Sequence, residues 1–543
     1  MSSSTDPDSN SNPKSNPRIS AKSTADPILR NALRYTISAK EYETLHSYIL
    51  SRSKVLKRNT PSVSRVEKLV QRPGRDDYNA AAVRASLRVF VATSAALKVW
   101  GLAKERFLGG RGSKKVPLWR NPNFRLSLSL STILLLHRIL FRFFTRLRAH
   151  LLAPEARPFR QRNKRTSKTL TSSLAPAVGA SLAGFALAIN PAEQLRVTIS
   201  IYALTRAAEF AYNLAEEEGW LWSKGQKPWW WGSWLLFPLT SGQLLHAFVF
   251  DRDCFPQAYG DFILKYSPQY IQSRPEDYPA NLPWPSSYDQ VDSLAEMARL
   301  RYPKFVSPIL FPNTTTLPPS LQKIAPITSP AHPLITSLSC AVLHPSDPSC
   351  TRTYLSHYLT TIPPLTRFFT LIFSVLSLPS YAKFYASPLK TLNNLAARIL
   401  RYTLFTSSSV GTSWAAICMF QKYLPPSLLS TQRFFLGGFI GGLWGYIVRR
   451  EARGEFLYAL RASLDSVWKV GRKRGWWRGV RGGDVWIFVV SLMVVNVVFE
   501  REKKAVNSGV VRRGVGFLRG EGLGDGLVEE EKRRAEQGEE KRV

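Results

Sequence analysis

The fold is decided by a stretch that reads Arg433-Phe-Phe-Leu-Gly-Gly-Phe-Ile-Gly-Gly-Leu-Trp-Gly-Tyr-Ile-Val-Arg-Arg450. The fifteen residues between Arg433 and Arg449 carry no charge, and five of them are glycine. In water each glycine would cost a helix about 1 kcal/mol relative to alanine. In a bilayer the backbone has no other hydrogen-bond partner, so the helix forms regardless. We therefore predict a membrane helix, because the bulky residues between the glycines argue against the alternative of a soluble loop.

Small residues recur every four positions in both halves of the chain. The two series are Ala175, Gly179 and Ala183, and Gly437, Gly441 and Gly445. Residues at this spacing share one face of a helix, and small side chains there let a neighbouring helix approach to backbone contact. We predict that both series are helix-packing faces inside a membrane.

Charge and composition favour a lipid partner. The 543-residue chain has a net charge of +36, and its lysines and arginines gather beside apolar segments, at 157–168, 449–481 and 501–519. This placement is typical of membrane-end anchors and of attraction to anionic lipids. The sequence has no RNA-recognition, zinc-finger or helix-turn-helix signature, so we predict no nucleic-acid partner. Neither end reads as a secretory signal or as a peroxisomal tripeptide, and the apolar helices with their basic flanks could carry the address instead.

Hydropathy divides the chain into five regions. We predict a disordered, basic region at 1–75, a first membrane bundle at 76–250, a Pro-rich polar connecting segment at 251–364, a second membrane bundle at 365–500 and a charged tail at 501–543. The predicted fold class is all-α, a polytopic helical membrane protein with two pseudo-repeated bundles of about four to five helices. Within the connecting segment we expect only short helices, such as 288–300.

An internal repeat supports the two bundles. Tyr-Ala-Leu follows the small-residue series in each half, at 202–204 and at 458–460, and an acid lies seven residues after each Tyr. A competing register aligns 178–183 with 410–415, but it scrambles the helix order and ranks second. If the helices that lead each bundle, 81–103 and 365–379, cross the membrane, the halves are inverted repeats. If they lie on its surface, the halves are parallel.

Two charged pairs are the candidate polar site. Arg206 lies one turn before Glu209, and Arg461 one turn before Asp465. Ionisable residues at membrane depth usually pair or face a wet interior. We consider a polar path between the bundles, an ion pair that only locks helices, and, for the second pair, an amphipathic helix at the interface.

The cysteines and histidines suggest no chemistry by spacing alone. Four scattered cysteines are too few for a disulfide framework and favour a reducing, intracellular setting. His344, Asp347 and Cys350, with Cys340 and His357 nearby, offer possible ligands. Their spacing matches no zinc pattern, however, and the prolines between them oppose a regular helical face. No nucleophile, phosphate-loop or dinucleotide motif is present, so we predict no metal, no cofactor and no enzyme.

These features together resemble the transmembrane protein 135 family of peroxisomal and mitochondrial membrane proteins. The stretch His344-Pro345-Ser-Asp-Pro-Ser-Cys350 is similar to the family's His-Pro-Ser-Cys motif, with three extra residues. The likeness runs over roughly 344–505, through the glycine helix and the segment around Tyr458 and Asp465. The 120–255 half joins it mainly through the repeat. The family is similar in turn to the inner-membrane translocase and small peroxisomal membrane protein superfamily, whose helices also carry glycine ladders.

The resemblance implies a helical membrane module concerned with organelle dynamics, lipid handling or passage of molecules, and it transfers no catalytic residue. We expect a peroxisomal protein first and a mitochondrial one second. One expectation is a pore-like or transport-like bundle, in which neutralising Glu209 or Asp465 abolishes flux. The alternative is a scaffold that recruits unknown protein partners through 251–364.

Overall fold

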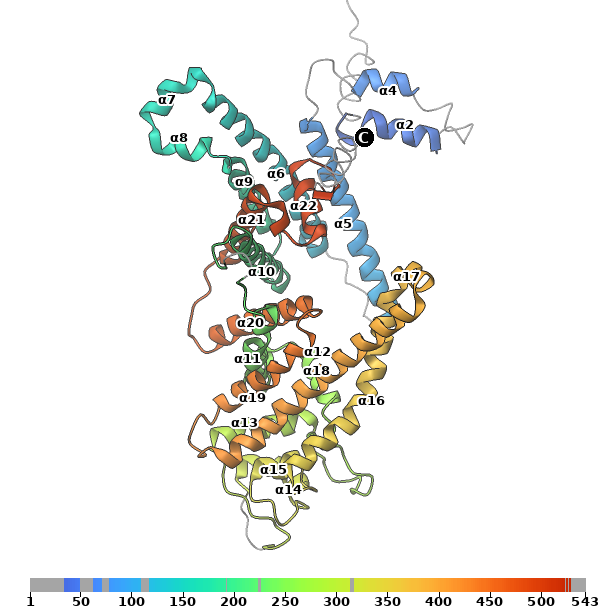
Figure 1. The fold of residues 1–543 in the computed structure, drawn as a ribbon, viewed down its shortest axis with the longest axis vertical. Coiled ribbons are helices and arrows are strands. Elements are labelled where there is room, and N and C mark those ends of the chain that lie inside the picture. The colour runs from blue at the N-terminus through green and yellow to red at the C-terminus, as the bar shows by residue number, and fades with distance from the viewer. Residues whose placement is uncertain are drawn as a thin grey trace, which may run out of the picture. The chain divides into compact units, whose positions relative to one another are not determined.

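The chain is all-α, as predicted. The computed structural model describes residues 34–48, 62–70, 78–108, 117–191, 193–222, 226–312, 317–522, 524–525 and 527–528 (Figure 1). Within these ranges there is no strand, only helices, turns and one isolated bridge between Lys304 and Ser337. Most of the predicted disordered region 1–75 lies outside the described residues, and the described part of it includes the short helices α2 (Ala39–Tyr48) and α4 (Val63–Val70).

The chain forms two compact units that do not follow the predicted bundles. Unit 1 comprises residues 1–200, 206–214 and 484–543, and unit 2 comprises 201–205 and 215–483. Helix α10 (Gln194–Glu217) contributes to both.

Unit 1 is built around one long helix, α6, which contacts α5, α8, α9, η4 and α22. Its further helices, besides α2 and α4, are α5 (Tyr78–Leu108), η2 (Leu118–Arg120), α6 (Pro122–Leu152), η3 (Pro154–Ala156), α7 (Arg157–Arg162), α8 (Lys164–Thr171), α9 (Ala175–Ala180), η4 (Ser181–Ile189), α21 (Gly483–Arg501), η10 (Lys503–Ala505) and α22 (Gly509–Arg519). Asn121 begins α6, because its side chain accepts a hydrogen bond from the Asn123 amide and Pro122 fits the first helical position.

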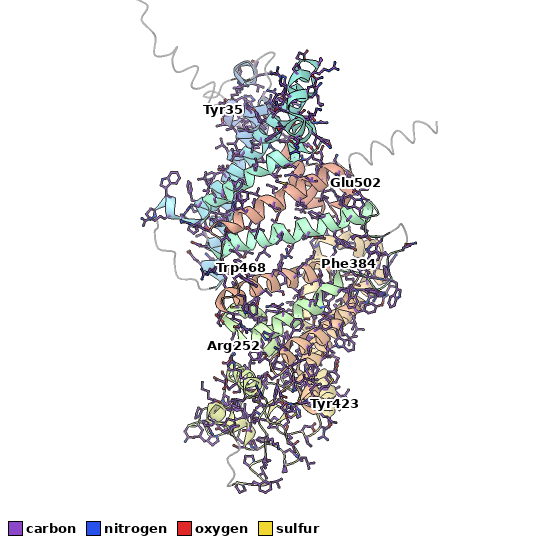
Figure 2. The ribbon with its side chains drawn as sticks, turned by 90° about the vertical axis from the view of Figure 1, so that its left-hand side faces the viewer. Tyr35, Arg252, Phe384, Tyr423, Trp468 and Glu502 are labelled. Atoms are coloured by element: carbon purple, nitrogen blue, oxygen red, sulfur yellow. The ribbon has the colours of Figure 1, made fainter. Side chains whose placement is uncertain are left out.

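Unit 2 packs its helices around α11, α18 and α19, with α16 lying along α18 (Figure 1). Its helices are η5 (Ser233–Leu235), α11 (Leu236–Phe250), η6 (Arg252–Cys254), α12 (Gln257–Lys265), α13 (Ser287–Arg299), η7 (Pro319–Ile324), α14 (Ala325–Thr328), α15 (Leu338–Leu343), α16 (Cys350–Ser377), η8 (Leu378–Ser380), α17 (Tyr381–Ala386), α18 (Pro388–Tyr423), α19 (Gln432–Gly442), η9 (Leu443–Val448) and α20 (Arg453–Lys473). Figure 2 labels Tyr423, where α18 ends, and Trp468, whose ring on α20 stacks on that of Trp477.

Two helices belong to a different unit from the bundle predicted for them. Helix α21, expected in the second bundle, joins unit 1, where Val489 packs beside Gly184. Helix α11, expected in the first bundle, joins unit 2, where Gly242 meets the backbone of Phe435. Hydropathy located these helices, but the fit between small and large side chains decides which helices pack together.

The predicted connecting segment 251–364 is a folded part of unit 2. Its apolar side chains, among them Tyr270, Val291 and Leu321, share one hydrophobic core with α11 and α18. The predicted short helix at 288–300 is present as α13, whose N-terminus has a capping box formed by Ser286 and Asp289. The predicted boundary at 364/365 falls inside α16, because this helix continues through Pro363 and Pro364 instead of ending there.

Among the described residues, four helices are long and apolar enough to cross a membrane. They are Tyr78–Arg106 of α5, α6, α16 and α21, and α8 with α9 and η4 would make a fifth, bent by 84°. Only 17% to 44% of their most apolar windows is buried inside the protein, so large apolar surfaces stay uncovered. The glycine stretch 433–448 is divided into α19 and η9, and neither part has the length of a span.

Candidate functional site

The glycines of α19 form two packing faces in unit 2. On one face, a Cβ atom at Gly437 would lie 3.2 Å from the Ser413 carbonyl oxygen of α18. A Cβ atom at Gly441 would lie 2.6 Å from the Ser409 carbonyl oxygen of the same helix. On the other face, a Cβ at Gly438 would lie 2.6 Å from the Ser241 carbonyl oxygen of α11. The hydroxyl of Ser241 also donates to the Gly438 carbonyl at 2.8 Å. The absence of side chains on α19 thus brings three helix backbones together.

The other small residues take similar positions. Gly445 faces the rings of Phe237 and Phe456, which a Cβ would meet at 3.3 and 3.4 Å. In unit 1, a Cβ at Gly179 would fall on the ring of Phe144 in α6. The series Ala175, Gly179 and Ala183 begins in α9 and ends in the 3-10 helix η4, and Gly179 and Ala183 are buried.

The first predicted charged pair forms in unit 1. The Arg206 guanidinium lies 2.7 Å from the Glu209 carboxylate, whose side chain is 4% exposed. Glu209 also accepts a hydrogen bond from the Asn507 amide at 3.1 Å. The carboxylate therefore ties α10 to the turn before α22, an arrangement typical of a helix-locking pair.

The second predicted pair is replaced by another within α20 of unit 2. Asp465 lies 2.7 Å from Lys469, one turn towards the C-terminus, and both side chains are partly exposed. The Arg461 guanidinium instead donates to the Leu457 carbonyl at 3.1 Å. A later lysine on the same face competes for the acid, since residues i and i+4 of a helix lie side by side.

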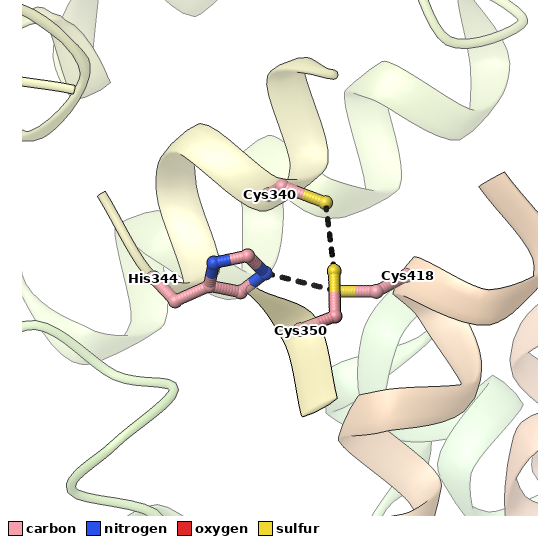
Figure 3. A group of neighbouring side chains, drawn as sticks. All are labelled: Cys340, His344, Cys350 and Cys418. Atoms are coloured by element: carbon pink, nitrogen blue, oxygen red, sulfur yellow. Dashed lines mark hydrogen bonds between the residues drawn. The ribbon is translucent and has the colours of Figure 1, made fainter. Parts of the chain in front are cut away.

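The predicted family motif lies beside two more cysteines. The side chains of His344 and Cys350 meet those of Cys340 and Cys418, and their four potential ligand atoms all lie within 4.8 Å of one another (Figure 3). Pro345 follows His344 at the end of α15, and its carbonyl accepts from the His332 amide at 2.8 Å. Burial disfavours the imidazolium, but the thiols of Cys340 and Cys350 outweigh this effect and raise the pKa of His344 to about 10.

Spacing along the chain suggested a different set of neighbours. His357 lies away from the cluster, with its Nε2 atom 3.2 Å from the Ser407 carbonyl. Cys418 reaches the cluster from α18, 68 residues after Cys350, a distance in sequence that no local motif reveals. Cys340 and His344 lie one turn apart at the end of α15, because the prolines begin only after His344.

Unit 2 also contains a partly open, apolar cavity of about 210 Å³. Helices α11, α12, α18 and α20 line it, mainly with aromatic and aliphatic side chains such as Phe262 and Trp414. The carboxylate of Glu455 is the acidic group in this lining, and it accepts a hydrogen bond from the Tyr402 hydroxyl at 3.1 Å. An apolar space with a few polar groups is typical of a site for a largely apolar ligand.

Comparison with known proteins finds no matching family model, curated protein or solved structure. The resemblance to the transmembrane protein 135 family therefore stays a prediction from the sequence.

Proposed function

We propose that this chain is an integral, multi-pass membrane protein of an organelle, the peroxisome first and the mitochondrion second, whose helical bundle handles lipid. The apolar cavity of unit 2 is the observation that supports lipid handling. The four candidate spans support membrane insertion. The choice of organelle depends on the family resemblance alone.

Uncovered apolar side chains on the candidate spans support insertion into lipid. On α16, the side chains of Leu359, Leu371 and Leu376 are between 63% and 80% exposed. On α5, Val99 and Trp100 are at least 65% exposed. Exposed large apolar side chains of this kind are unfavourable in water and favourable in a bilayer core.

We expect the protein to stay in the membrane pellet after alkaline carbonate extraction of isolated organelles. Carbonate strips proteins held by charge, whereas a helix whose apolar surface lies in the bilayer core remains. Immunoblotting of pellet and supernatant measures this, with a known peripheral protein as the control. Release into the supernatant would contradict integral insertion.

The cavity suits an acyl chain better than a polar solute. Its walls include Leu244, Phe255 and Ile263, which offer no hydrogen bonds, and its polar groups include Ser409 on α18 and Glu455 on α20. Dispersion contacts along such walls hold a chain of methylene groups, and the Ser409 or Glu455 oxygens could meet a head-group donor. The polar pairs at Glu209 and Asp465 offer less, because their partners already satisfy them.

We expect Ala462→Phe to reduce labelling of the protein by a photoactivatable fatty acid several-fold, because the ring would occupy the cavity that Ala462 lines. Leu464→Phe, which places the same side chain on α20 at a position outside the lining, should leave labelling unchanged. Labelling in reconstituted vesicles, followed by peptide mapping, measures both. Equal labelling of the two variants would contradict a lipid site in this cavity.

A scaffold remains the second candidate, because 251–364 also carries an exposed apolar patch. Ile309, Leu310 and Phe311 are each more than half exposed. Deleting the whole segment would remove much of the unit 2 core, so this function has to be tested at the patch and not by deletion.

A further inference from the structure

The geometry points to a metal centre in unit 2, in which Cys340, His344, Cys350 and Cys418 bind one Zn²⁺ ion. This inference does not depend on the lipid proposal, and it departs from the expectation that the chain binds no metal. Figure 3 shows the four side chains converging from α15, from the start of α16 and from α18.

Two of the six distances between ligand atoms match those of tetrahedral zinc, and the other four are at most 4.8 Å. With Zn–S bonds of about 2.3 Å and Zn–N bonds of about 2.0–2.1 Å, two sulfurs of a tetrahedron lie about 3.8 Å apart, and a sulfur and a nitrogen about 3.5 Å apart. The Cys340 and Cys350 sulfurs are 3.8 Å apart, and the Cys418 sulfur is 3.5 Å from the His344 Nε2 atom. The four side chains therefore need little movement to surround an ion.

Neighbouring groups orient the histidine as a ligand. The His344 Nδ1 atom lies 2.7 Å from the Asp347 backbone carbonyl, to which it can only donate, so the proton belongs on Nδ1. Zinc would displace the proton from Nε2, whose lone pair then points at the sulfurs, and zinc-bound histidines usually have such a partner on their other nitrogen. Arg352 holds the Asp347 carboxylate with two hydrogen bonds of 2.6 and 2.7 Å, which fixes the loop that supplies this carbonyl.

The start of α16 favours a thiolate at Cys350. Ser349 is the N-cap of this 28-residue helix, so Cys350 occupies its first position, where the helix dipole stabilises negative charge. Thiolates are the form that binds zinc. Cys340, His344 and Cys418 are each less than 9% exposed, and the low dielectric around them strengthens metal–thiolate attraction.

An ion can reach the site from one side. The three cysteines line an open cavity of about 870 Å³, together with Tyr354 and Lys422. Because four protein side chains complete a tetrahedron, no position is left for a substrate water, and the centre is structural. Its ion would join the folded segment 251–364, through α15, to the long helices α16 and α18. The simpler alternative is that the thiols and the imidazole only pack in the hydrophobic core.

We expect the purified full-length protein in detergent to contain one zinc ion per chain by elemental mass spectrometry. Cys418→Ser should lose nearly all of it, because oxygen replaces a thiolate ligand. The matched control is Cys254→Ser, which changes the remaining buried cysteine, outside the cluster, and should keep the full metal content. Equal zinc in the two variants, or no zinc above a metal-free control protein in the wild type, would overturn the proposal.

If Cys418→Ser does not fold, two measurements on the wild-type protein still test the metal site. Cobalt added to chelator-treated protein should give the intense ligand-field and charge-transfer bands of tetrahedral thiolate coordination, and zinc should abolish them. After denaturation without reductant, all four cysteines should react with a maleimide. Absence of the cobalt bands, or two cysteines blocked in a disulfide, would refute the metal site.

Discussion

Gly441→Ala is expected to destabilise unit 2 by about 1–3 kcal/mol, the usual cost of adding a methyl group to a closely packed interface. The new Cβ atom would lie 2.6 Å from the Ser409 backbone carbonyl oxygen, and a backbone atom cannot rotate away as a side chain can. Helix α19 would have to move off α18 and, because its other face touches α11, would strain that contact as well. Thermal unfolding in detergent, followed by circular dichroism or by dye binding, measures the loss.

Gly454→Ala is the matched control for this substitution. Gly454 also lies in a helix of unit 2, α20, and a Cβ atom there meets nothing within 4 Å. Alanine should therefore leave stability unchanged or raise it by up to about 1 kcal/mol through helix propensity. If both variants unfolded at the wild-type temperature, close backbone contact on α19 would not be what the glycines provide.

The sequence predicts the helices well, because each depends on a local pattern. A few turns of sequence are enough to recognise the uncharged apolar runs, the small-residue spacing at 437–445 and the helix at 288–300. Local patterns do not predict which helices pack against one another. The lack of a side chain at Gly441 indicates that another helix packs closely there. Only the structure identifies that helix as α18 and shows that α11 packs against Gly438 on the other face.

The candidate site was predictable only in part, for the same reason. An i, i+3 ion pair such as Arg206–Glu209 follows from helix geometry. Asp465 had two basic neighbours at similar spacing, and the structure selects Lys469. Cys418 lies far in sequence from Cys340 and His344, so a search for local zinc spacing could not include it. The prolines around 345–348 do oppose a regular helical face, but they also begin the loop whose Asp347 carbonyl orients His344.

Asp484→Ala is expected to destabilise unit 1 by about 3–5 kcal/mol, the usual cost of removing one partner from a buried ion pair. The Asp484 carboxylate accepts two hydrogen bonds from the Arg196 guanidinium, one of them 3.0 Å from Nη2 to Oδ1. The two side chains are 18% and 9% exposed. This pair joins the first turn of α10 to the first turn of α21, so its loss should separate a helix pair that is nearly 300 residues apart in sequence.

The double substitution Arg196→Met with Asp484→Ala distinguishes the two sources of that cost. If most of it comes from an arginine left buried without its carboxylate, the double variant should recover much of the stability, since methionine needs no counter-charge. If the pair itself supplies the stability, the double variant should be no better than Asp484→Ala. Arg196 also donates to the Asn190 carbonyl at 3.1 Å, so a small loss should persist even with recovery. Unfolding in detergent measures all three proteins, and wild-type stability of Asp484→Ala would show that α10 and α21 do not meet through this pair.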